Sequence, residues 1–211
     1  MCTHEKMRFG KDQVHRYDLE KDDAPREWLF MSIKPIWLLY EPWAEDSSIQ
    51  QTIAKKAGRK IDVAIDEGGR ICGFTIFRLL RHESLKIMFR GNSYFCRNVR
   101  GLGAALFRRT INQYKADRIV TFTQQERIYA FLGHFGKTLP TDGEYLSDSE
   151  YRLMCKLAGS SYTVDRETLI VQDFYHAAQA QEGGPVKNTR VRDLFTQLGE
   201  RDAFAVVTRR N

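Results

Sequence analysis

Alternating apolar and polar positions near the middle of the chain predict a run of β-strands. Residues 61–65 and 85–89 each alternate apolar with more polar side chains, which is the period of a half-buried strand. Between them, Gly68 and Gly69 supply the positive φ values of a tight turn, before a partner strand over 71–79. These segments predict a three-stranded antiparallel meander.

The segments before this meander carry two different patterns. Residues 28–43 are rich in aromatic and aliphatic side chains, but Pro35 and Pro42 interrupt them, so we expect no single continuous helix there. Residues 44–58 have isoleucines four apart and end at a glycine, Gly58, which predicts a helix.

Helical and strand periods alternate after the meander. Residues 107–114 carry one apolar helical stripe, 117–123 form a β-branched strand, and 124–133 a second helix. Residues 151–157 and 203–207 predict further strands. The order strand, helix, strand implies a βαβ crossover with some parallel pairing. The fold class is therefore α/β of the α+β type, with a mixed, mostly antiparallel central sheet and flanking helices.

The composition is that of an ordinary globular protein. Of the 211 residues, 42% are hydrophobic and 28% are charged, and no apolar run is long enough to cross a bilayer. The first residues mix charges of both signs and lack the apolar core of a signal peptide, so we expect a cytoplasmic protein. The four cysteines form no CxxC pair and the histidines no HExxH motif, which predicts reduced thiols and no metal site.

The net charge of +6 favours anionic partners such as nucleic acid or a phosphorylated cofactor. Ordinary solubility is the alternative, because lysine and arginine are spread along the chain. The charge alone does not separate the two.

One short segment combines glycine, arginine and the start of a helix. In CRNVRGLGAALFRR, residues 96–109, Gly101 and Gly103 follow a predicted strand and lead into an apolar helix. The first N–H groups of a helix lack helical partners and lie at the positive end of its dipole, so they suit a phosphate. Glycine keeps a Cβ out of the way, and Arg97 and Arg100 add charge. A plain turn is the alternative, since GxxxxGK[ST] is absent and GxGxxG is incomplete.

This segment resembles the acyl-CoA pyrophosphate loop of the GNAT superfamily of N-acyltransferases, written Q/R-x-x-G-x-G/A. Gly101 and Gly103 match, whereas Asn98 stands where that loop has Gln or Arg. The glycine hairpin before the loop is similar to one in that superfamily. Residues 127–135 resemble its downstream tyrosine-bearing helix, and residues 140–157 are similar to its closing strands.

The resemblance implies acetyl-CoA or another acyl-CoA as co-substrate, with no metal, in a cleft between two splayed central strands. Backbone N–H groups of the loop would hold the pyrophosphate, and residues 93–95 would pair with the pantetheine arm. The implied cofactor-binding residues are Asn98, Val99, Arg100, Gly101, Leu102, Gly103 and Ala104.

The resemblance also implies direct attack of a neutral amine on the thioester. Tyr129 would supply a proton to the departing thiolate, and a packed helix aromatic is its alternative role. The base is not identified. Many members have an acid near the end of the strand before the loop, but residues 89–96 contain none. His82, Glu83 and Glu126 are expected on the surface, so a water chain is a further alternative.

We expect three parts: an amino-terminal lead segment over 1–30, a GNAT-like acyltransferase domain over 31–157 and a carboxy-terminal appendage over 158–211. The implied partner is an amine-bearing acceptor of unknown class, with no membrane; nucleic acid, an acyl-carrier protein and a homodimer stay open. Two alternatives keep the fold. One uses an acyl-carrier-protein thioester or modifies nucleic acid, and the other binds a ligand without catalysis.

Overall fold

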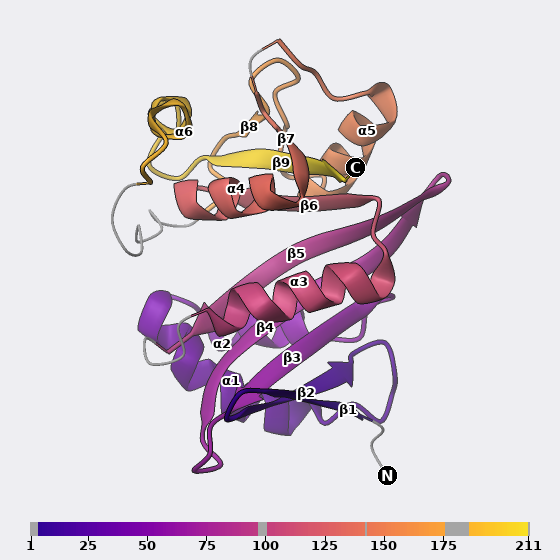
Figure 1. Cartoon of the computed structure of the whole chain (residues 1–211), viewed down its shortest axis with the longest axis vertical. Helices are drawn as coiled ribbons and strands as arrows, with labels where there is room; N and C mark the ends of the chain where they lie inside the picture. The colour runs from indigo at the N-terminus through magenta and orange to yellow at the C-terminus, as the bar shows by residue number, and fades with distance from the viewer. Residues whose placement is uncertain (1–3, 97–100, 142, 176–185, 211) are drawn as a thin grey trace. The chain divides into compact units, whose positions relative to one another are not determined.

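The structure of the chain is a computed structural model, shown in Figure 1. The residues that it describes are 4–96, 101–141, 143–175 and 186–210. The chain divides into two compact units. These units are residues 1–80 with 88–115, and residues 81–87 with 116–211.

The first unit contains strands that lie in chain order. β2 pairs with β1 and with β3, and β3 pairs with β4, each in an antiparallel register, while β5 lies next to β4. In the turn between β3 and β4, Gly69 has φ +78°, a left-handed backbone that favours glycine, so the predicted glycine hairpin is confirmed. The bounds are β1 His4–Phe9, β2 Asp12–Asp18, β3 Arg59–Ile65, β4 Ile71–His82 and β5 Leu85–Phe95.

Helices cover both faces of these strands (Figure 1). Because side chains alternate along a strand, β3 sends Ile61 and Val63 into the core under α1 and α2, and Ala64 to the opposite side. On that opposite side, Leu102 and Leu106 of α3 complete a second core. The bounds are α1 Arg26–Tyr40, α2 Asp46–Ile53 and α3 Leu102–Tyr114.

α1 is one helix although it contains a proline. Pro35 lies inside it and Pro42 follows its end, so the expected interruption at Pro35 is wrong. Leu29, Ile33 and Trp37 form a buried stripe at helical spacing, packed against the strands. Burying such side chains is worth about 1.5–3 kcal/mol each, which together offsets the hydrogen bond that proline removes.

A buried ion pair fastens α3 to the strands. Arg16 on β2 donates to Asp62 on β3 through Nε at 2.6 Å and Nη2 at 2.7 Å, and these side chains are 4% and 0% exposed. The same guanidinium donates to Thr110 Oγ1 at 2.6 Å and to Gln113 Oε1 at 2.7 Å, both on α3. Burial acts to lower the pKa of Arg16, but the hydrogen bond and charge of Asp62 raise it, so the guanidinium stays charged.

In the second unit, three other strands of the described residues all pair with β9. These pairings, with β6, β7 and β8, are antiparallel, and the first six residues of β9 are buried. The strand predicted over 203–207 is therefore confirmed. The bounds are β6 Arg118–Thr123, α4 Glu126–Leu132, β7 Gly136–Leu139, α5 Asp148–Ala158, β8 Ile170–Val171, α6 Thr189–Phe195 and β9 Ala203–Arg210.

Residues 151–157 lie in a helix, α5, and the predicted strand there is wrong. A capping box starts this helix: Ser147 Oγ accepts from the Glu150 N–H at 3.2 Å, and the Glu150 carboxylate accepts from the Ser147 N–H at 3.1 Å. Leu153 and Met154 are buried together with Glu150, which is helical spacing. The expected closing strand is consequently absent from this segment.

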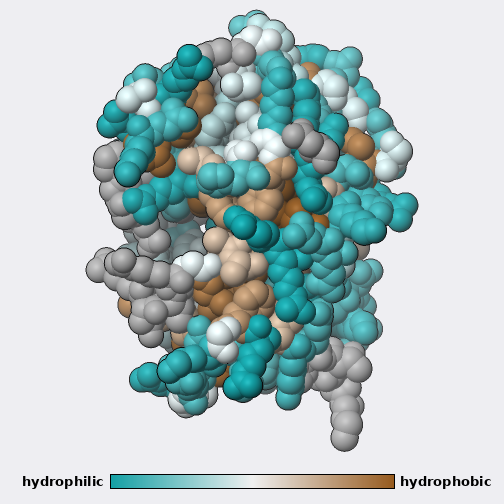
Figure 2. All heavy atoms as spheres, in the orientation of Figure 1, coloured by the Kyte–Doolittle hydropathy of each residue, from teal (hydrophilic) through white to brown (hydrophobic). Residues whose placement is uncertain are grey.

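Together the described elements make a mixed α/β fold with mostly antiparallel pairing, and the predicted fold class is confirmed. Residues 1–30 supply β1 and β2, and residues 158–211 supply β8 and β9, so both terminal segments contribute strands. The domain boundaries expected from the sequence stay a prediction. Hydrophilic residues cover most of the face in Figure 2, with smaller apolar areas between them. Within the described ranges, every helix is too short or too polar to cross a membrane.

Candidate functional site

The predicted pyrophosphate loop lies only partly within the described residues. Asn98, Val99 and Arg100 lie outside them, and their role stays a prediction. The described part starts at Gly101 and continues directly into α3. The site is therefore built here from the end of β5 and the first turn of α3.

The first turn of α3 leaves backbone donors without helical partners. Gly101 is its N-cap, with φ +81° and ψ −14°, and its carbonyl accepts from the Ala105 N–H at 3.0 Å. In the described residues no side chain caps this helix, and its first turn contains no acidic residue. A Cβ built on Gly101 meets no atom within 4 Å. The Cβ position of Gly101 thus adjoins open space, and the N–H groups of the first turn lie at the positive end of the helix dipole, an arrangement suited to an anion.

Gly103 has a different physical role in this structure. A Cβ built there lies only 2.8 Å from Cε2 of Phe95, the last residue of β5. The same ring also fills the space beside Gly73 on β4, where a Cβ would lie 2.2 Å away. Glycine at both positions lets the Phe95 ring pack between strand and helix. The motif glycines thus allow close packing of α3 as well as any approach of a ligand.

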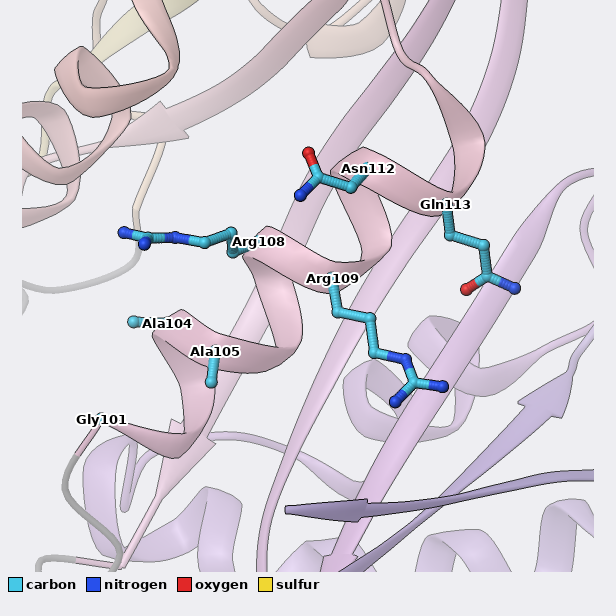
Figure 3. A pocket seen from close by; sticks show the side chains of 7 residues that line it. All are labelled: Gly101, Ala104, Ala105, Arg108, Arg109, Asn112 and Gln113. Carbon is cyan, nitrogen blue, oxygen red and sulfur yellow. The ribbon is translucent and has the colours of Figure 1, made fainter. Parts of the chain in front are cut away.

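A shallow pocket of about 740 Å³ follows the exposed side of α3 (Figure 3). Arg108 points to the same side as Ala104 and Asn112, whereas Arg109 and Gln113 point the other way. The Arg109 guanidinium lies 5.6 Å from the ring centre of Phe9, and Gln113 accepts from Arg16. Of the two arginines that line the pocket, Arg108 is therefore the one on the same side of α3 as Ala104. The residues lining the pocket are Gly101, Ala104, Ala105, Arg108, Arg109, Asn112 and Gln113.

A carboxylate that sequence reasoning missed lies at the end of β5. Glu41, the C-cap residue of α1, accepts from the Tyr94 hydroxyl at 2.6 Å and from the indole N–H of Trp37 at 2.7 Å. Asn92 Nδ2 in turn donates to the Tyr94 oxygen at 3.2 Å. Glu41 and Tyr94 are 53 residues apart in the chain, so no local pattern connects them. The sequence signal was limited to an acidic residue directly before Pro42.

Tyr129 lies on α4 and is 9% exposed. Its hydroxyl donates to the backbone carbonyl oxygens of Thr138, at 3.2 Å, and Pro140, and its ring meets Phe195 edge to face at 5.8 Å between centroids. These contacts hold the ring and the hydroxyl in one orientation. The role of Tyr129 as a proton donor stays a prediction.

The described cysteines are free thiols, at positions 72, 96 and 155. Burial raises the pKa of the Cys72 thiol to about 11, which makes it a poor nucleophile at neutral pH. Within the described ranges, no three His, Cys, Asp or Glu side chains come together as metal ligands.

No protein-family model matches the chain, and no curated protein matches it in sequence. Solved structures do match in fold. GCN5 of Tetrahymena is 16% identical with a TM-score of 0.46, over 64% of this chain and 83% of that one. The ribosomal-protein-alanine N-acetyltransferase of Brucella melitensis biovar Abortus 2308 is 15% identical with a TM-score of 0.39, over 52% and 78%.

A third match is Naa50 of Arabidopsis thaliana, solved in complex with the bisubstrate analogue CoA-Ac-MVNAL. It is 15% identical with a TM-score of 0.48, and the match covers 94% of this chain and 98% of that one. These neighbours are GNAT acetyltransferases, the superfamily that the sequence motifs resemble. At these identities the likeness concerns the fold alone.

Proposed function

We propose that this chain is an N-acyltransferase that moves an acetyl or other acyl group from acyl-CoA to an amine by direct attack. The observation that carries the proposal is the start of α3. A helix begins at Gly101, in left-handed backbone beside open space, and no side chain of the described residues caps it. Successive N–H groups at the positive end of a helix dipole suit the two negative phosphates of a pyrophosphate.

In the proposed reaction the amine nitrogen bonds to the thioester carbon, the C–S bond breaks, and the thiolate takes a proton. The N–H groups of Leu102, Gly103 and Ala104 hold the pyrophosphate, with Asn98, Val99 and Arg100 completing the loop. Arg108 adds positive charge on the side of α3 that carries Ala104. Tyr129 is the proposed proton donor, which would stabilise the charge that develops on sulfur.

Calorimetric titration with acetyl-CoA tests the proposed phosphate site through a single methyl group. Gly101→Ala places a Cβ in the open space where the phosphate would approach, and we expect the dissociation constant to rise about tenfold or more. Gly69→Ala is the matched control. Gly69 has nearly the same backbone, φ +78° against +81°, and its Cβ also meets no atom within 4 Å. Both changes carry a similar strain of about 1–2 kcal/mol.

Two outcomes contradict the proposed site: no binding of acetyl-CoA to the wild-type chain, or equal affinities of wild type and Gly101→Ala. Once binding is established, release of free thiol is measured with a panel of small amines, peptides and DNA. Repeating the panel with an acyl-carrier-protein thioester separates the proposed co-substrate from that alternative.

A ligand-binding protein without catalysis is the second candidate function, and the environment of Tyr129 favours it. A hydroxyl that already donates to two backbone carbonyls must leave them to protonate a thiolate. Acetyl-CoA binding without acylation of any acceptor in the panel would support this second candidate.

A further inference from the structure

We propose that Glu41, acting through the hydroxyl of Tyr94, accepts the proton that the amine loses as it attacks the thioester. This inference rests on the proposed function. A neutral amine that forms an amide must give up a proton, and a positioned acceptor for it accelerates the step. The sequence places no carboxylate in residues 89–96, so a carboxylate acceptor would come from another element.

Glu41, at the end of α1, lies beside Tyr94 of β5. The Tyr94 hydroxyl donates to Glu41 Oε1 at 2.6 Å, the distance of a strong hydrogen bond to a charged acceptor. Trp37 Nε1 donates to the other carboxylate oxygen at 2.7 Å, and the Glu41 backbone N–H donates to the Trp37 carbonyl at 2.9 Å. The carboxylate is thus held from two sides in one orientation, with one oxygen directed at the phenol.

The Tyr94 ring is fixed by its aromatic neighbours. It stacks on Tyr40 with centroids 5.0 Å apart and planes at 14°, and it meets Trp37 and Phe74 edge to face, each at 5.6 Å. The Tyr40 hydroxyl donates to the carbonyl of Phe95, the last residue of β5. Tyr94 therefore cannot turn away from Glu41 without breaking this packing.

Access from solvent remains, because Glu41, Asn92 and Tyr94 are each only half-buried. If the contact only held α1 against β5, any pair of hydrogen-bonding side chains would be sufficient. Here the pair is a carboxylate and a phenol, so the phenol oxygen can accept a proton while the phenol gives its own proton to the carboxylate. Tyr94 also belongs to residues 93–95, the segment expected to lie along the pantetheine arm.

The proton balance of the step is as follows. As the C–N bond forms, an N–H proton passes to the Tyr94 oxygen while the Tyr94 proton passes to Glu41 Oε1. The C–S bond breaks and its electron pair stays on sulfur. Tyr94 ends neutral and Glu41 ends as a carboxylic acid, which returns its proton to water before the next turnover.

The test uses the full chain with acetyl-CoA and an amine that shows turnover in the panel, with thiol release measured at one fixed pH. Glu41→Gln and Tyr94→Phe should each lower kcat about 10²-fold or more, with KM for acetyl-CoA unchanged within about twofold. The double variant should be no slower than the slower single variant, because both act in one relay.

Tyr151→Phe is the matched control. It removes a tyrosine hydroxyl that donates to the backbone carbonyl of Val164 and leaves the contact between Glu41 and Tyr94, so kcat should stay within about threefold of the wild type.

The outcomes separate this inference from the function on which it rests. Undiminished kcat in Glu41→Gln or in Tyr94→Phe overturns the relay and leaves the acyltransferase proposal in place. A wild-type chain that binds no acetyl-CoA, or acylates no amine, overturns both.

Discussion

The two glycines of the loop motif are required for different reasons. Gly101 occupies left-handed backbone beside open space, where an L side chain is strained and where a ligand can approach. Gly103 has no positive φ, and its hydrogen faces the ring of Phe95 instead. A motif written as G-x-G therefore combines a conformational requirement with a packing requirement, and a substitution at Gly103 would disturb α3 before it disturbed a ligand.

Tyr129→Phe tests the role of that hydroxyl. If Tyr129 protonates the thiolate, we expect kcat to fall about 10²-fold with the KM for acetyl-CoA nearly unchanged. Loss of the hydrogen bonds to Thr138 and Pro140 lowers the free energy of unfolding by about 1 kcal/mol in either case. Steady-state kinetics and urea unfolding of the same protein separate the two effects.

The control is Tyr151→Phe, because the Tyr151 hydroxyl also donates to a backbone carbonyl, that of Val164, at 3.0 Å. This variant should lose stability without losing kcat. Undiminished kcat in Tyr129→Phe, together with a similar loss of stability, would assign Tyr129 to packing alone.

At the level of single helices, α1 shows how packing overrides a local preference. A proline inside a helix costs about 3 kcal/mol through its missing N–H and its ring. Pro35 lies on the exposed side, so its ring disturbs no core contact, while the opposite side buries Leu29, Ile33 and Trp37. Those contacts hold the helix together, and they also place Glu41 at its end.

Pro35→Ala should therefore stabilise the chain. The change restores a backbone donor within α1 and removes the ring, so we expect the free energy of unfolding to rise by about 1–3 kcal/mol in urea titration. Pro25→Ala serves as the comparison, because Pro25 is the N-cap of the same helix, where a missing N–H breaks no helical bond. It should change stability by less than about 1 kcal/mol. A destabilised Pro35→Ala variant would contradict this account.

The second wrong prediction concerns α5, a helix that was predicted as a strand. Residues 151–157 alternate in polarity over a short stretch, and short apolar runs do not separate the two periods. The capping box of Ser147 and Glu150 was the stronger local signal, since it satisfies two N–H groups at the start of a helix. Glu150 then contributes to the tertiary structure as well.

For the molecule as a whole, the charge network at Glu150 makes stability depend on acid pH. This side chain is 3% exposed and accepts from Arg118 Nε at 2.8 Å and from Arg209 Nη2 at 2.6 Å. Burial by itself raises its pKa, but the hydrogen bonds from Arg209 and Arg118 prevail and lower it from 4.5 to about 2. The carboxylate thus joins α5 to β6 and β9 in its charged form.

Because the folded pKa is lowered, this stabilisation is complete above about pH 4.5 and is lost as the pH falls toward 2. We expect the stability difference between wild type and Glu150→Gln to shrink by about 3 kcal/mol over that range, measured by denaturant unfolding at successive pH values. Glu67→Gln, at an exposed ion pair with Lys11, is the control, because a surface ion pair contributes little to stability. A Glu150→Gln difference that stays constant down to pH 2 would contradict the account.

Local patterns predicted most of the strands and helices around the site. The glycine hairpin, the strand over 117–123 and the helices beginning near 102 and 126 all follow from side-chain periods and turn residues. The motif around Gly101 also predicted an anion site, and that site stays a prediction. Each of these signals spans only a few neighbouring residues, and so it is readable without the fold.

The hairpin of β1 and β2 escaped prediction for a physical reason. Arg16 stands at a buried position of β2, directly across from Asp62 on β3, and this charge interrupts the apolar alternation that marks a strand. The pair is separated by 46 residues, and the bond from Arg16 to Gln113 spans 97. Only a partner brought near by the fold makes a charged residue suitable for burial.

The contact of Glu41 and the helical position of Pro35 could not be predicted for the same reason. Chain neighbours reveal a period, a turn or a cap, because those depend on contacts within about four residues. They do not reveal that Glu41 meets Tyr94, or that buried contacts outweigh the cost of Pro35. Most of the local order of elements thus follows from the amino-acid sequence, whereas the contact between Glu41 and Tyr94 and the long helix α1 depend on free energy from distant contacts.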